Sequence, residues 1–188
     1  DNNPNNDLKE ALSENFSYEW LPKQELDNLL LGKYCSSCAH LNGAGAGIMR
    51  ASIVSPDCQN LVIRDESGKI ISKSTIYVNR QGKYAVFNTV ETSLFYSFKQ
   101  ENINKIYNAF IRGARAFINE FNKNNPNQQL EIITLAQKRN TLEEIMENND
   151  SIHPIVMPYS HIDYSIFQYN GNGYYIGDTT DTQRLILM

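Results

Sequence analysis

The stretch that decides the fold is NLVIRDESGKIISKSTIYVNRQGKYAVFNTVET, residues 60–92. It contains runs rich in β-branched and aromatic residues, separated by polar turn segments at residues 65–68 and 79–82. Turns this short cannot hold a crossover helix, so neighbouring strands must run antiparallel. The stretch therefore predicts an antiparallel sheet with strands over residues 60–66, 69–79 and 83–92.

A long amphipathic helix is predicted after this sheet. Apolar residues recur at steps of three and four from Ile103 to Phe121, and Pro126 marks the end of the pattern. Gly113 lies in the middle, where glycine costs about 1 kcal/mol relative to alanine, so we expect close approach to a strand. The apolar run from Leu130 to Ala136 predicts a strand parallel to the strand at 83–92, because a helix joins the two.

Weaker signals surround these elements. Upstream, the pattern predicts a disordered tail at residues 1–6, helices at 8–16 and 22–32, and a strand, GIMRASIV, at 47–54. Downstream, it predicts a short helix at 141–148, a hairpin around 170–173 and a terminal strand at 182–188. The expected architecture is a single domain at residues 7–188, of α/β (α+β) class, with a mixed, mainly antiparallel sheet flanked by helices.

Composition limits the possible functions. The chain has 188 residues, 41% hydrophobic and 20% charged, with a net charge of -4. A weakly acidic balance argues against nucleic-acid binding, and no apolar run approaches the roughly 20 residues that span a bilayer. Without a visible signal peptide, the expected location is the cytoplasm. The chain begins at Asp1, so we expect a piece excised from a larger protein.

The cysteines suggest a metal site. Cys35, Cys38 and His40 follow one another closely, and Cys58 comes later, which gives four ligands of the kind that structural zinc sites use. Three small buried thiols, a redox pair and a catalytic cysteine–histidine unit remain as alternatives. The glycines that follow, NGAGAG, fail the phosphate-loop pattern because its next glycine would fall on Ile48.

The quoted hairpin, together with YAVFNTVET and INKIYNAFIRGARAFINEF, resembles the GNAT superfamily of N-acetyltransferases. The resemblance covers the order of elements from Leu8 to Met188. The chain also resembles, more closely, bacterial GNAT-like proteins with the pattern GKYCxxCxH followed by CQNLVIRD. The resemblance implies a GNAT-like fold and transfer of an acetyl group from acetyl-CoA to an amine on a small molecule or a protein.

The resemblance also implies roles for particular residues. Glu91, at the end of its strand, takes the position of the base, with a solvated strand end as the plain alternative. The acid that protonates the leaving thiolate would be Tyr174, with packing roles as the alternative and with Tyr164, Tyr169 and Tyr175 as other candidates. The cofactor would lie against Val90, Thr92 and Ile103.

One feature departs from the family. Its phosphate-binding loop reads Gln/Arg-x-x-Gly-x-Gly/Ala, whereas the corresponding interval here, TSLFYSFKQENINK at residues 92–105, has no glycine. Two hypotheses therefore stand side by side. The first is a GNAT-like acyltransferase, active or inactive, and the second is a non-enzymatic module of a larger protein stabilised by zinc. A cysteine-dependent hydrolase using Cys35 or Cys38 with His40 is the third.

Overall fold

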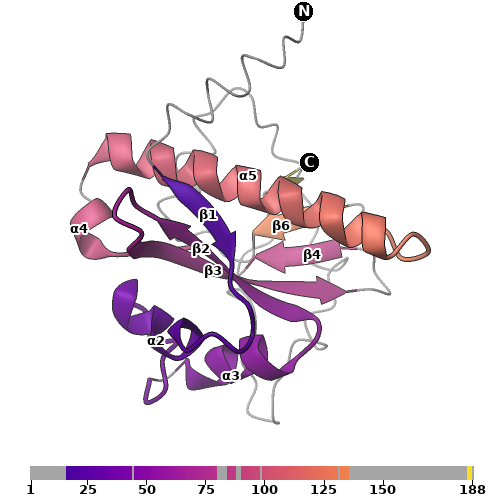
Figure 1. Ribbon diagram of the computed structural model, residues 1–188, viewed down its shortest axis with the longest axis horizontal. Coiled ribbons are helices and arrows are strands. Elements are labelled where there is room, and N and C mark those ends of the chain that lie inside the picture. The colour runs from indigo at the N-terminus through magenta and orange to yellow at the C-terminus, as the bar shows by residue number, and fades with distance from the viewer. Residues whose placement is uncertain are drawn as a thin grey trace, which may run out of the picture.

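The computed structural model describes residues 16–43, 45–79, 84–87, 90–97, 99–130, 132–135 and 186–187 (Figure 1). In chain order these residues form β1 (Ser17–Trp20), α2 (Asp27–Tyr34), α3 (Ala46–Val54), β2 (Cys58–Arg64), β3 (Ile70–Asn79), β4 (Tyr84–Phe87), β5 (Glu91–Thr92), α4 (Leu94–Ser97), α5 (Gln100–Asn124), β6 (Ile132–Leu135) and β7 (Ile186–Leu187).

The strands form one sheet in the order β1-β2-β3-β4-β6-β7, and β5 is a further partner of β3. The pairs β1–β2, β2–β3, β3–β4, β3–β5 and β6–β7 are antiparallel, and β4 pairs with β6 in parallel. The predicted antiparallel hairpins and the parallel strand after the long helix are therefore confirmed. The predicted α+β class, with a mixed and mainly antiparallel sheet, is confirmed with them.

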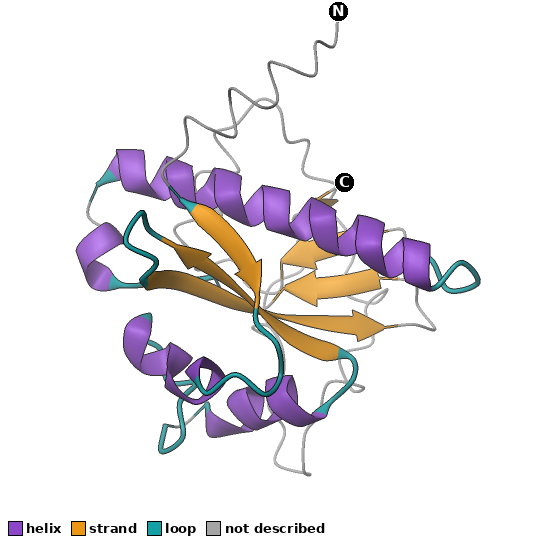
Figure 2. Cartoon of the chain, viewed as in Figure 1, coloured by secondary structure: helices purple, strands orange, loops and turns teal. Residues whose placement is uncertain are grey.

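Helices lie on both faces of the sheet. Figure 2 shows α5 crossing one face and α2 with α3 lying against the other. On the α5 face, Leu61, Ile76 and Phe87 of the sheet form a core with Ile106 and Phe110 of the helix, and each is at most 2% exposed. The predicted amphipathic helix is thus confirmed as the main apolar cover of the sheet. None of the described helices is long and apolar enough to cross a bilayer.

The opposite face of the sheet carries a buried polar network centred on Asn60 of β2. The Asn60 Nδ2 atom donates to Asn28 Oδ1 at 2.8 Å and to Ser52 Oγ at 2.9 Å, and Asn60 Oδ1 accepts from Thr75 Oγ1 at 2.6 Å. All four side chains are buried. Because each makes a hydrogen bond, the network ties α2 and α3 to the sheet without leaving these groups desolvated and unpaired.

The strand predicted at residues 47–54 is wrong, because this segment forms the helix α3. Its side chains meet the sheet in a helical pattern, and Ser52 accepts the hydrogen bond from Asn60 at 2.9 Å. Lys23 Nζ donates to the carbonyl oxygens of Ser52, at 3.2 Å, and of Ser55 at the end of α3. A lysine on the terminal carbonyls stabilises a helix, so these tertiary contacts outweigh the β-propensity of the sequence.

The helix predicted at residues 22–32 is shifted to Asp27–Tyr34. Asn28 Nδ2 donates to the carbonyls of Pro22 at 2.8 Å and Glu25 at 3.1 Å, which holds the segment before the helix in a turn. Gly32 does not end the helix. A Cβ atom there would lie 2.6 Å from the carbonyl oxygen of Ala39, so the glycine makes room for the loop that follows.

Strand β1 was not among the predicted elements. It pairs with β2 from Ser17 opposite Arg64 to Trp20 opposite Leu61. Of the predicted helix at residues 8–16, only Phe16 is described, and it is a buried, non-helical residue of the core. The elements predicted at 141–148 and 170–173 lie outside the described residues, and the terminal strand is described at residues 186–187.

The predicted close approach at Gly113 is confirmed. A Cβ atom at this position would lie 2.8 Å from Leu61 Cδ1 and 3.1 Å from Tyr18 Cδ2. We therefore expect Gly113→Ala to lower the free energy of unfolding by about 1–3 kcal/mol, although alanine is the better helix former. Urea unfolding would measure this, with the exposed Asn119→Ala on the same helix as the control. A Gly113→Ala protein more stable than the parent would contradict the steric explanation.

Candidate functional site

The strand predicted at residues 83–92 is interrupted in the structure. Phe87 of β4 pairs with Ile76 of β3, and Glu91 of β5 pairs with Lys73 of β3. The chain thus advances by four residues from Phe87 to Glu91, whereas their partners on β3 are only three residues apart. The pairing register with β3 therefore shifts by one residue between β4 and β5.

The interruption follows directly on the end of the parallel pair β4–β6. The last described pair of these strands is Phe87 with Leu135, and these two residues are also the last described residues of β4 and β6. Ligands in sheets with parallel strands bind beyond the carboxyl ends of those strands. The candidate site is therefore this edge of the sheet. It is formed by the ends of β4 and β6, the interruption between β4 and β5, β5 itself and the start of α5.

Glu91 lies at this edge and forms an ion pair with Lys73. The register places the two residues directly opposite each other, and Lys73 Nζ contacts Glu91 Oε2. The side chain of Lys73 is 2% exposed and that of Glu91 is 24% exposed. Ser72 Oγ donates to the Glu91 carbonyl at 3.1 Å and shares a hydrogen bond of 3.0 Å with Thr92 Oγ1. Glu91 thus has a fixed position and partial access to solvent.

Lys73 was not predicted as a site residue. It stands in the strand KIISKSTIYVN, in which the other residues from Ile70 to Val78 are apolar or carry a hydroxyl group. A lysine is almost never fully buried unless it is paired. That composition was therefore a signal that a carboxylate would be found opposite, and the partner is the predicted base.

Cys35, at the end of α2, lies close enough to this pair to be affected by its charges. Burial raises the pKa of the Cys35 thiol to about 12, while the charge of Lys73 lowers it and that of Glu91 raises it. The thiol is thus protonated at neutral pH, and a thiolate is the form that acts as a nucleophile or metal ligand. This environment does not favour the hydrolase hypothesis at Cys35.

The four residues predicted as zinc ligands do not form a metal site. Among the described residues, which include Cys35, Cys38, His40 and Cys58, no group of three or more potential ligands is close enough to hold a metal ion. Cys58 stands opposite Tyr77 on β3, four residues from Lys73, which corresponds to about 13 Å along a strand. The helix α3 fills the interval between the cysteine pair and Cys58, and this is the physical reason for the separation.

The remaining ligand candidates differ in their surroundings. Cys38 is exposed, Cys58 is buried, and burial raises the pKa of Cys58 to about 11. The Nδ1 atom of His40 is buried without a hydrogen-bond partner.

The three thiols should therefore react at very different rates. At pH 7 we expect an aromatic disulfide reagent to modify Cys38 at least about tenfold faster than Cys35 and Cys58, whose raised pKa values leave almost no thiolate. Mass spectrometry of the labelled peptides would measure the rates, and the unfolded protein, in which all three thiols are accessible, is the control. Equal rates for Cys35 and Cys38 in the folded protein would contradict the burial of Cys35.

The residues predicted to contact a cofactor lie at this edge in different roles. Val90 is 4% exposed and Ile103 is 8% exposed, so their side chains are part of the interior beneath the edge. Thr92 is half-buried and uses its hydroxyl for the hydrogen bond with Ser72. Tyr174, the predicted acid, lies outside the described residues.

The start of α5 completes the edge. Lys99 is the N-cap residue, is exposed, and makes no side-chain capping hydrogen bond. Glu101 in the first turn pairs with Lys105 at 2.8 Å. The first N–H groups of a helix are available to an anion, whereas an acidic side chain there opposes one. An anion at the start of α5 would therefore meet both favourable and opposing charge.

The short helix α4 is anchored beside this edge by a residue pair that the sequence did not predict. Tyr96 donates to Asp65 Oδ2, and Asp65 Oδ1 accepts from the backbone N–H groups of Ser67 and Lys69, each at 3.0 Å. Burial raises the pKa of Asp65, but these hydrogen bonds outweigh it and the pKa lies below its ordinary value. The β2–β3 turn thereby fixes α4, whose Leu94 and Phe95 side chains are exposed.

No family model matches the sequence, and no curated protein matches it. Solved structures do match. Spermidine N-acetyltransferase from Vibrio cholerae is 12% identical, with a TM-score of 0.47, over 93% of this chain and 94% of that chain. The ribosomal-protein-S18-alanine N-acetyltransferase from Escherichia coli is 12% identical, with a TM-score of 0.47, over 92% and 90%. Tetrahymena GCN5 is 11% identical, with a TM-score of 0.47, over 91% and 93%.

Two of these matched structures are named as N-acetyltransferases.

Proposed function

We propose that this domain is a GNAT-like acyltransferase that transfers an acetyl group from acetyl-CoA to an amine, with Glu91 as the base. The observation that carries the proposal is the position of Glu91. It is a partly exposed carboxylate on β5, where the pairing register with β3 has shifted by one residue, and it follows the carboxyl end of β4 in the parallel pair β4–β6. A base in acetyl transfer must be held firmly and must also be reachable by the acceptor, and Glu91 meets both conditions.

In this proposal each group has a defined task. The acceptor enters as an ammonium ion and gives a proton to the Glu91 oxygen that is not engaged with Lys73. The amine nitrogen forms a bond to the carbonyl carbon of the thioester, and the carbon–sulfur bond breaks. The CoA sulfur leaves with a proton, for which Tyr174 is the proposed donor. The bonded nitrogen then gives its second proton to the Tyr174 oxygen, so that a neutral amide forms, and Glu91 releases its proton to solvent. Lys73 keeps Glu91 in place through the cycle.

The donor would be bound at the start of α5. The exposed Lys99 and the first N–H groups of the helix would bind the phosphates, while the backbone atoms of Val90 and Thr92 would line the edge. No glycine lies between residues 92 and 105, so this edge departs from the family's phosphate loop. We also propose the cytoplasm as the location, since the three cysteines are free, as in reducing compartments.

Calorimetric titration with acetyl-CoA tests this proposal directly. We expect saturable binding that is weakened by Lys99→Gln and unchanged by Lys33→Gln, an exposed lysine on α2 that serves as the matched control. No heat of binding at millimolar acetyl-CoA would overturn the enzymatic proposal. It would leave a fold shared with acetyltransferases but not their chemistry.

A non-enzymatic module of a larger protein is the second candidate, and the glycine-free interval at residues 92–105 favours it. The described residues lend no support to the zinc ion that was expected to stabilise such a module. Metal analysis of the purified protein distinguishes the two versions of this candidate. About one zinc per chain would restore the metal-stabilised version, and none would end it.

A further inference from the structure

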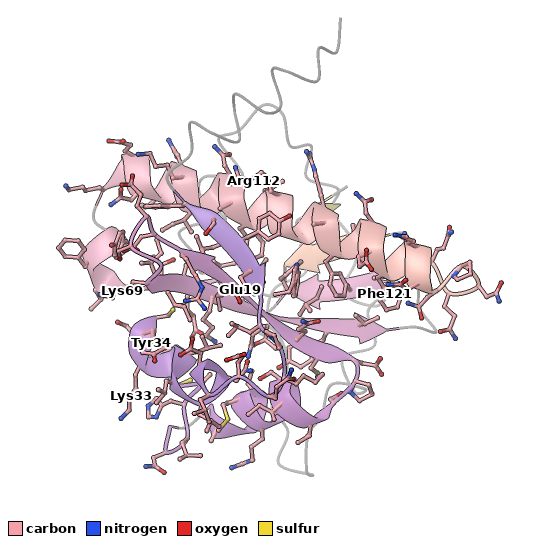
Figure 3. The ribbon with its side chains drawn as sticks, viewed as in Figure 1. Glu19, Lys33, Tyr34, Lys69, Arg112 and Phe121 are labelled. Carbon is pink, nitrogen blue, oxygen red and sulfur yellow. The ribbon has the colours of Figure 1, made fainter. Side chains whose placement is uncertain are left out.

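The described residues line a pocket at the opposite end of α5 from the candidate acyl-transfer site. It has a volume of about 530 Å³, and it lies between the second half of α5, the end of β1, the start of β2 and the end of β3. Figure 3 shows Phe121, one of its lining residues, far from Lys69, which belongs to the β2–β3 turn near α4. The volume falls within the range of about 300–1,000 Å³ that is typical of small-molecule sites.

Aromatic rings form one wall of this pocket. Trp20 is held in place by a hydrogen bond of 3.1 Å from its Nε1 atom to the carbonyl of Gly113. Its ring centroid lies 4.7 Å from that of Phe117, and Phe117 stacks on Phe121 at 5.9 Å. All three rings are half-buried, so each keeps part of its surface accessible. The pocket therefore presents a preformed aromatic surface against which a further ring can stack or meet edge to face.

Side chains of the sheet line the same pocket. Ile76 and Val78 of β3 and Cys58 of β2 are among the lining residues, and each is at most 7% exposed. Burial raises the pKa of the Cys58 thiol to about 11, so this group is uncharged at neutral pH. The pocket is thus apolar on its sheet side as well as on its helix side, as expected of a site for an apolar body.

The charged lining residues do not favour an ionic ligand. The described lining contains two carboxylates, Asp57 and Glu120, neither of which is buried, and no lysine, arginine or histidine. Asp57 interacts with the charge of Lys23, and the exposed Glu120 accepts a hydrogen bond from Asn124 Nδ2 at 2.7 Å. An ion that entered the pocket would lose hydration and meet no buried counter-charge among the described residues, so an uncharged ligand is favoured.

We propose that this pocket binds a small uncharged molecule that carries a flat aromatic ring. The ring would pack against Phe117 and Trp20, and the side chains of β2 and β3 would cover its other side. The site is separate from the acetyl-CoA edge and does not depend on the proposed function. It would operate in the same way in an enzyme or in a non-enzymatic module.

The single tryptophan of the chain is Trp20, so its fluorescence reports on this pocket. We expect 2-phenylethanol to change the fluorescence saturably, with an affinity at least about threefold higher than that of its saturated analogue 2-cyclohexylethanol. The saturated ring is the more apolar of the two, so a preference for the aromatic ring separates ring packing from simple burial. Neither phenylacetate nor 2-phenylethylammonium should bind more tightly than the alcohol, and calorimetry repeats each titration independently of the fluorophore.

Phe117→Leu removes one ring of the wall and keeps an apolar side chain in its place. It should raise the dissociation constant of 2-phenylethanol by about threefold to tenfold and change that of 2-cyclohexylethanol by less than about twofold. Phe95→Leu, the same substitution on the exposed face of α4, is the matched control and should leave both constants unchanged. A thermal melt of each variant confirms that binding is measured on folded chains.

Four results would overturn the proposal. The first is no saturable binding of millimolar 2-phenylethanol by either method, and the second is equal affinity for the aromatic and the saturated alcohol. The third is tighter binding of 2-phenylethylammonium or phenylacetate than of the alcohol, which would indicate a site for an ion instead. The fourth is an equal effect of Phe117→Leu and Phe95→Leu on the binding of 2-phenylethanol.

Discussion

Replacing Glu91 by leucine is expected to lower the free energy of unfolding by about 3–5 kcal/mol. The variant leaves the ammonium of Lys73, which is 2% exposed, buried without its counter-charge. Lys73→Met should cost less, about 1–3 kcal/mol, because the remaining carboxylate of Glu91 is 24% exposed and stays partly hydrated. The order of the two effects follows directly from the unequal burial of the partners.

The double variant Lys73→Met with Glu91→Leu should recover most of the loss, since neither charge then remains. Replacing a buried ion pair by apolar side chains is often close to neutral, whereas removing one partner is not. Urea unfolding of the four proteins at neutral pH gives the coupling energy of this double-mutant cycle. Additive effects of the two single variants would mean that the ion pair does not stabilise the fold.

Glu91→Gln is expected to lower kcat/KM for acetyl transfer by about 10²–10⁴-fold, if the proposed function is right. An amide cannot accept the proton from the acceptor ammonium. It can still accept a hydrogen bond from Lys73, so this variant should lose less stability than Glu91→Leu, and a thermal melt checks that it is folded. The folded variant should bind acetyl-CoA with nearly the parent affinity. The loss should therefore appear in the transfer rate and hardly in calorimetric titration with the donor.

The matched control is Glu25→Gln, the same substitution at an exposed position before α2. It should leave both rate and binding unchanged. If Glu91→Gln has full activity, Glu91 is a structural partner of Lys73 rather than the base. If it loses activity and donor binding together, the substitution has disturbed the donor-binding edge of the sheet rather than proton transfer.

The elements with local signals were predictable from the sequence. Strands β2 and β3 and the helix α5 each show a clear periodicity, and Gly113 in the middle of the helix pattern indicated a close contact. The segment Ala46–Val54 was not predictable in this way. Its helix depends on contacts from Lys23 and Asn60, which are distant in sequence and become visible only once the chain is folded.

The candidate site was only partly predictable, because it also depends on pairings between residues that are distant in sequence. Glu91 was predicted near the end of a strand at residues 83–92, whereas the structure has it as the first residue of the short strand β5. Its partner depends on the pairing register between β3 and β5, which is shifted by one residue relative to that between β3 and β4. A one-residue shift of register carries little signal in the sequence. The zinc hypothesis was based on spacing alone, and spacing does not show that a helix stands between Cys38 and Cys58.

The pairing of β1 has a consequence for the order of folding. The turn that joins β2 to β3 closes over a few residues, with Gly68 at φ 81° and an Asp65 N–H bond to the Lys69 carbonyl of 3.0 Å. β1 pairs with β2 only after α2 and α3 have closed a loop of about 40 residues, which has a larger entropic cost. We therefore expect the β2–β3 hairpin to be the folding nucleus and β1 to pair with β2 late. Because β1 carries the only tryptophan, Trp20, its fluorescence would report the rate of this late pairing.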